Sequence, residues 1–219
     1  MFPDVSIATE TLAAGCAAPA SPLRCCLLSG GQSRRMGRDK ALLAHPRGGT
    51  WLEATLLLLA ELGAPITLLS GHGQHISLAT RLAPGQALPL TAIREPLPHE
   101  GPLLALGRLM EAYPGARLLL CPVDMPALTL PCLQRLLEVS LAAPALVHVA
   151  HDGRRAQPLL GVYPASPGHR SSLAATLGAG GRALRLWLDL AGCIEVPLPA
   201  SALRNVNRPG DLALPNSPA

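Results

Sequence analysis

Aromatic side chains are scarce in this sequence, since Phe, Trp and Tyr make up 2% of its 219 residues. Proteins bind single-stranded nucleic acids largely by stacking bases on such side chains, so the composition argues against a nucleic-acid partner. Charged residues are also few, at 15% of the chain, and the formal net charge is +4. A modest positive charge suits a small polyanion better than a long nucleic acid.

The sequence also lacks a long apolar run. The leucine-rich stretch at 56–62 is interrupted by Glu61 and followed by Gly63, so we predict no membrane-spanning helix. Residues 1–22 have neither the basic start nor the continuous apolar core of a secretory signal, and we predict a disordered N-terminal tail there. Residues 23–214 are expected to form one domain and residues 215–219 a C-terminal tail. A cytoplasmic protein without a membrane partner is expected.

No two of the six cysteines form a C-x-x-C pair. The spacing therefore favours buried, reduced thiols over a disulfide framework or a zinc site. Two of them are adjacent in a predicted strand, so their side chains are expected to point to opposite faces of the sheet. The cysteines are Cys16, Cys25, Cys26, Cys121, Cys132 and Cys193.

Three common catalytic or phosphate-binding motifs are missing: the Walker A sequence, G-x-G-x-x-G and the G-x-S-x-G nucleophile elbow. What the chain has instead is residues 27–43, LLSGGQSRRMGRDKALL. An apolar run stops at Gly30 and Gly31, and three arginines and Lys40 follow within one loop. Glycine lets backbone N–H groups approach a ligand, and the cations suit phosphate oxygens. We interpret this stretch as a nucleoside-triphosphate site.

Predicted strands and helices alternate along most of the chain, which indicates an α/β fold. We expect a mainly parallel sheet with helices on both faces, and a late antiparallel hairpin at Asp152-Gly153. Strands are predicted at residues 23–29, 66–70, 90–94, 117–121, 145–150, 157–162 and 194–196. Helices are predicted at residues 50–62, 102–113, 131–141, 166–177 and 183–190, with a weak one ending at residue 82.

Asp124 follows the strand predicted at residues 117–121, where open α/β sheets gather their sites. A carboxylate there can bind Mg²⁺, although it could also cap the following helix. Asn205 and Asn207 offer amide oxygens near the C-terminus. His72 and His75 lie three residues apart, but no carboxylate or cysteine nearby in the sequence completes a metal site, so a surface role is predicted.

Residues 28–40 (LSGGQSRRMGRDK) closely resemble the nucleotide-binding loop of the molybdenum cofactor guanylyltransferase (MobA) family. Further blocks agree in order: residues 101–103 (GPL), 121–126 (CPVDMP) and 205–212 (NVNRPGDL). Residues 152–159 resemble the family's late hairpin, and residues 181–188 its following helix. The likeness covers roughly residues 23–212.

This resemblance implies a Rossmann-like nucleotidyltransferase fold and Mg²⁺-dependent transfer of GMP from GTP to the molybdopterin cofactor, giving the guanine dinucleotide and pyrophosphate. Lys40 falls on the family's phosphate-binding lysine, Asp124 on its magnesium-binding aspartate, and Arg35 is expected to assist them. The nucleotide is expected at Leu28, Ser29, Gly30, Gly31, Arg34, Lys40, Glu95 and Asp124. The pterin is expected at Asn205, Asn207, Gln157 and Arg182.

Two positions depart from the family pattern. Glu95 stands where an aspartate is common, and residues 70–72 (SGH) stand where an asparagine is frequent. Gly30-Gly31 and Met125-Pro126 resemble the guanylyl enzymes more than their cytidylyl relatives, which implies guanine over cytosine. The alternatives are a cytidylyltransferase acting on molybdopterin or on a sugar or polyol phosphate, and a non-catalytic carrier of the cofactor. Proteins of molybdoenzyme maturation are possible partners.

Overall fold

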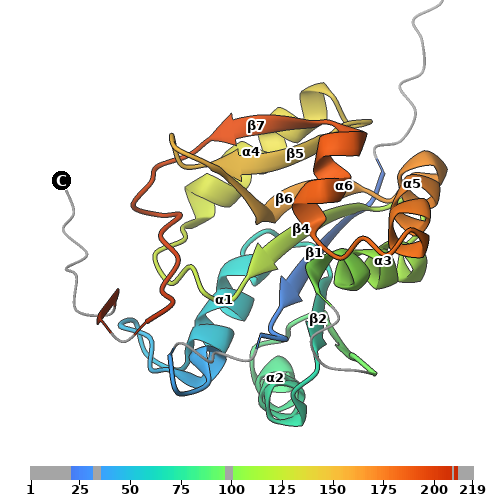
Figure 1. Cartoon of the computed structure of the whole chain (residues 1–219). Helices are drawn as coiled ribbons and strands as arrows, with labels where there is room; N and C mark the ends of the chain where they lie inside the picture. The colour runs from blue at the N-terminus through green and yellow to red at the C-terminus, as the bar shows by residue number, and fades with distance from the viewer. Residues whose placement is uncertain (1–20, 32–35, 97–100, 209, 212–219) are drawn as a thin grey trace, which may run out of the picture.

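The computed structural model describes residues 21–31, 36–96, 101–208 and 210–211. Within them one seven-stranded sheet has the order β3-β2-β1-β4-β6-β5-β7 (Figure 1). Its strands are β1 (Leu23–Leu28), β2 (Ile66–Ser70), β3 (Leu90–Arg94), β4 (Arg117–Pro122), β5 (Val147–His151), β6 (Ala156–Pro164) and β7 (Cys193–Pro197). Most of the tails predicted at residues 1–22 and 215–219 lies outside the described residues.

The sheet has two parts of different character. Strands β1, β2, β3 and β4 pair with one another in parallel only, and we call them the parallel half. In the mixed half, β6 runs antiparallel to both β4 and β5, whereas β7 is parallel to β5. The predicted mainly parallel sheet with a late hairpin is therefore confirmed. The chain moves outward from β1 to β2 and β3, then crosses back to β4, so a topological switch point lies between β1 and β4.

Helices cover both faces of the sheet, as predicted (Figure 1). The chain also contains a short 3₁₀ turn, η1, before the first α-helix. Helix α1 begins with the capping box that Thr50 and Glu53 form. Helices α1, α2 and α4 supply apolar side chains to one core cluster, and α3, α5 and α6 to the other. The bounds are η1 (Lys40–Leu42), α1 (Trp51–Ala60), α2 (Gly73–Gly85), α3 (Pro102–Ala112), α4 (Leu130–Ala142), α5 (Pro167–Gly178) and α6 (Leu184–Ala191).

The cysteines show the same two-sided packing. Cys25 belongs to the cluster beneath α1 and α4, whereas Cys26 belongs to the cluster beneath α3 and α6, so the adjacent side chains do point to opposite faces. Burial raises the pKa of the Cys25 thiol to about 12, which makes it a poor nucleophile. Burial was wrongly predicted for Cys193, which is exposed in β7. Cys16 lies outside the described residues.

In the described ranges, no helix combines the length and the apolar character needed to cross a membrane.

Candidate functional site

A pocket of about 290 Å³ lies at the carboxyl ends of β1 and β4, at the switch point of the sheet. Its wall combines the end of the first strand, the turn η1 and the loop after β4. The predicted nucleotide-binding residues that the structure describes all line it: Leu28, Ser29, Gly30, Gly31, Lys40, Glu95 and Asp124. Arg34 and Arg35, also predicted to act here, lie outside the described residues.

Lys40 and Asp124 meet in this pocket although 84 positions separate them in the chain. Lys40 Nζ lies 3.3 Å from Asp124 Oδ2, and it donates a hydrogen bond of 2.5 Å to Asn207 Oδ1. The two charged side chains are 12% and 23% exposed, so solvent screens their interaction only in part. The tertiary structure thus places a cation and a carboxylate side by side at the carboxyl ends of parallel strands.

Asp124 also meets the chemical requirement of a metal ligand. Its Oδ1 atom is buried and has no hydrogen-bond partner among the described residues. A buried carboxylate oxygen without a partner carries a desolvation penalty that a bound cation would relieve. Capping is not the role of this residue, because α4 begins after Thr129. No cluster of three or more His, Cys, Asp or Glu side chains suited to a metal occurs in the described part of the chain.

Glu95 reaches the pocket from the end of β3 and is 11% exposed on its side chain. Its Oε1 atom lies 3.6 Å from Arg108 Nη1, so the carboxylate is held in an ion pair and is not an ordinary surface charge. Gly30 allows this approach, because a Cβ atom there would lie 2.5 Å from Glu95 Oε2. The glycine therefore makes room for a carboxylate as well as exposing backbone to the pocket.

A polar chain connects the C-terminal segment to the hairpin. Asn205 Nδ2 donates to Gln157 Oε1 at 3.1 Å, and Gln157 Nε2 donates to Asp152 Oδ2 at 2.7 Å. Between the two asparagines, Val206 is buried, and its N–H donates to the carbonyl of Asp124 at 3.0 Å. Asn205 thus contacts the hairpin while Asn207 contacts Lys40, and one short segment links both parts of the site.

Arg182 is not drawn into this chain of contacts. Its guanidinium Nη1 donates to the carbonyls of Leu177 and Gly181, at 3.1 and 2.9 Å, and the side chain is exposed. Its backbone lies closer to the pocket, since a Cβ on Gly101 would come within 3.2 Å of the Arg182 carbonyl oxygen. The side chain therefore caps the end of α5 in this structure.

Sequence reasoning missed His75. The surface role predicted for it is wrong, because the residue is 1% exposed and lines the pocket. A carboxylate does lie beside it: Nε2 is 2.8 Å from Oδ2 of Asp39. The two residues are 36 positions apart, so no local pattern could reveal the pair. The nearest signal was Asp39 directly before Lys40, an arrangement suited to capping a short helix.

The sequence profile of the MobA-like NTP transferase domain matches residues 25–191. The protein from Mycobacterium tuberculosis named probable molybdenum cofactor guanylyltransferase is 35% identical over 202 residues, which cover 90% of this chain and 94% of that protein. The chain belongs to the MobA-like NTP transferase family. It is accordingly a nucleotidyltransferase, and enzymes of this type generally use a divalent metal ion.

Two solved structures agree with the family fold. Molybdopterin-guanine dinucleotide biosynthesis protein A from Archaeoglobus fulgidus superposes with a TM-score of 0.64 at 17% identity, covering 86% of this chain and 94% of that one. The 4-diphosphocytidyl-2C-methyl-D-erythritol synthase from Anaerococcus prevotii gives 0.70 at 9% identity, covering 88% and 93%. At such low identities these matches establish the nucleotidyltransferase fold alone.

Proposed function

We propose that the protein transfers GMP from GTP to the molybdopterin cofactor in a Mg²⁺-dependent reaction, releasing pyrophosphate. The observation that carries this proposal is the pairing of Lys40 with Asp124, whose second carboxylate oxygen is buried without a partner in the described part of the chain. The names of the Mycobacterium relative and of the Archaeoglobus protein support the choice of substrates.

The reaction forms a bond between a terminal phosphate oxygen of molybdopterin and the α-phosphorus of GTP. The bond from that phosphorus to the bridging oxygen breaks, and its electron pair leaves with pyrophosphate. The attacking phosphate is already ionised near neutral pH, so no general base is required. Positioning and charge neutralisation therefore dominate the catalysis.

Each part of the pocket has a role in that positioning. Lys40 would donate from Nζ to triphosphate oxygens, and the backbone N–H groups of Gly30 and Gly31 would add neutral donors. Arg34 and Arg35 are proposed to bind the same phosphates. Asp124 would hold Mg²⁺ through its carboxylate oxygens, and the bound ion supplies positive charge at the phosphates.

The remaining substrate groups are assigned to Glu95 in the pocket and to polar residues beside it. Glu95 is proposed to contact the nucleotide. Asn205, Asn207 and Gln157 are the proposed pterin contacts, and Arg182 is proposed with them although its side chain bonds to the end of α5 here. Partner proteins of molybdoenzyme maturation stay a prediction, and so does the cytoplasmic location, which is inferred from the cysteine spacing and the lack of a secretory signal.

The test is pyrophosphate release by the purified protein with Mg²⁺, molybdopterin and each of GTP, CTP, ATP and UTP in turn. Release with GTP, together with a thermal shift larger for GTP than for CTP, is the expected result. Release with CTP instead would identify a cytidylyltransferase. Tight binding of molybdopterin with no nucleotide-dependent release would identify a carrier.

A further inference from the structure

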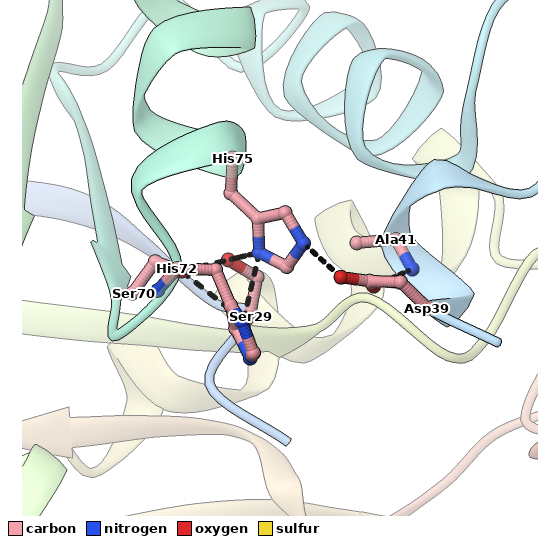
Figure 2. A network of polar contacts seen from close by, with 6 residues as sticks. All are labelled: Ser29, Asp39, Ala41, Ser70, His72 and His75. Carbon is pink, nitrogen blue, oxygen red and sulfur yellow. Dashed lines mark hydrogen bonds and ion pairs between the residues drawn. The ribbon is translucent and has the colours of Figure 1, made fainter. Parts of the chain in front are cut away.

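His75 lies in the first turn of α2, the third residue of that helix, and it is buried between the end of β1 and the turn η1 (Figure 2). Its Nδ1 atom lies 2.9 Å from the carbonyl oxygen of Ser29, and its Nε2 atom lies 2.8 Å from Asp39 Oδ2. One imidazole ring therefore contacts both the residue that follows β1 and the residue that precedes η1.

Those two contacts lie at the two ends of residues 30–38, the segment that begins with Gly30-Gly31 and that we call the glycine loop. Ser29 is the last residue before Gly30-Gly31, and Asp39 is the last residue before Lys40. Asp39 uses both carboxylate oxygens, because Oδ1 accepts from Ala41 N at 3.0 Å and so caps η1, while Oδ2 meets His75. Since Lys40 is the first residue of η1, the orientation of its backbone depends on this cap.

The chemistry of a histidine fits this position closely. The atoms nearest to the two ring nitrogens are a carbonyl oxygen and a carboxylate oxygen, which accept hydrogen bonds, so each nitrogen faces a partner for an N–H donor. Two hydroxyl oxygens also lie 3.1 Å from Nδ1: Ser29 Oγ, and Ser70 Oγ, which donates to the Ser29 carbonyl at 3.2 Å. Such a buried, satisfied network fixes the relative placement of the segments it joins.

We propose that His75 is a positioning residue for the triphosphate of the nucleotide. By joining Ser29 to Asp39 it holds the two ends of the glycine loop together and orients Lys40 towards the phosphates. The inference rests on the proposed function, because it deepens the role of the same pocket. It assigns His75 a part in binding phosphate and none in reading the base.

The chain offers matched variants for the test. Asparagine in place of histidine retains a donor near the Nδ1 position, and glutamine retains one near Nε2. We therefore compare His75→Asn with His75→Gln, and we measure dissociation constants for GTP and for inorganic tripolyphosphate, both with Mg²⁺. His169→Asn and His169→Gln are the controls, because His169 is likewise the third residue of its helix, α5, and its ring contacts Ser166 Oγ at 2.8 Å.

Loss of one charge-assisted hydrogen bond corresponds to roughly tenfold in affinity. We expect His75→Asn to lower the affinity for both probes by about that factor. His75→Gln should lower both affinities by less, because it keeps the contact to Asp39. The two His169 variants should bind like the wild type. Equal affinity for all five proteins would overturn the inference, and so would a loss seen with GTP but not with tripolyphosphate.

Two further measurements keep the inference testable if the His75 variants do not fold. Asp39→Asn retains an oxygen that can cap η1 while removing the carboxylate from His75, and it is expected to weaken both probes. In the NMR spectrum of wild-type protein labelled with ¹⁵N at histidine, the Nε2 atom of His75 should carry a proton. A ring without that proton could not donate to Asp39, and this result would contradict the inference. If the wild type binds neither probe, the proposed function fails, whereas intact binding in every variant defeats the positioning role alone.

Discussion

The parallel half and the mixed half of the sheet contribute to the pocket in different ways. In the parallel half, β1, β3 and β4 deliver site residues from their carboxyl ends: Ser29, Glu95 and Asp124 each follow directly or closely after a strand. In the mixed half, β6 runs the other way, with Leu120 of β4 opposite Gly161. Its beginning therefore lies at the same edge, where Gln157 meets Asn205. An antiparallel strand can therefore contribute to the same site, but it does so with the residues at its amino end.

The largest effect is expected in the parallel half, from Lys40→Ala and Asp124→Ala. Removing a positioned charge from such a site costs on the order of 3 kcal/mol, so the rate of pyrophosphate release should fall roughly a hundredfold or more. Thermal unfolding should show an intact fold. Arg135→Ala is the control, because its ion pair with Glu138 on α4 is exposed. Unchanged release by both pocket variants would remove the proposed mechanism.

In the mixed half the sharpest test of packing is Gly161→Ala. A Cβ atom there would lie 2.6 Å from the backbone oxygen of His148, which cannot rotate away as a side chain could. We expect a loss of about 2 kcal/mol in the free energy of unfolding, measured with urea. Gly178→Ala on α5 is the matched control, since nothing lies within 4 Å of its Cβ position. Equal stability of the two variants would contradict this account.

The link between the halves is tested by Gln157→Ala and Asn205→Ala. Each should raise the Michaelis constant for molybdopterin by about tenfold, because a partner in a partly buried hydrogen bond is lost, while the constant for GTP changes little. The double variant should be no worse than either single one, since both remove the same contact. A parallel rise for GTP would show that the hairpin does not serve one substrate alone.

The smallest effect concerns the hairpin turn and pH. Backbone N–H groups of Arg155 and Arg154 donate to Asp152 and hold the pKa of its carboxyl at about 2, below the usual 3.8. Because the folded pKa is the lower one, the stabilisation is complete above about pH 4 and disappears as the pH falls towards 2. The difference in melting temperature between wild type and Asp152→Asn should shrink over that interval. A difference independent of pH would count against this contribution.

Several features follow from local sequence patterns. The helix predicted to begin at residue 50 agrees with α1, which the capping box of Thr50 and Glu53 starts, and Asp152-Gly153 predicted the hairpin. The glycine loop after an apolar run, together with Asp124 after another, predicted a phosphate site at the carboxyl ends of strands, and the described residues of both line one pocket. The helix start and the hairpin were predicted correctly because each depends on residues within a few positions of one another, where periodicity and turn chemistry act directly; the phosphate site stays a prediction.

Other features were decided only when the chain folded. The antiparallel insertion of β6 between β4 and β5, the burial of His75 against Asp39 and the contact of Gln157 with Asn205 all join residues distant in sequence. The turning of the Arg182 side chain onto the end of α5 depends on hydrogen bonds that composition does not specify. The sequence by itself determined which residue types gather at the strand ends. The tertiary structure decided which of them touch, because hydrogen bonds and ion pairs need atoms within about 3 Å, and only the packing of the sheet sets those distances.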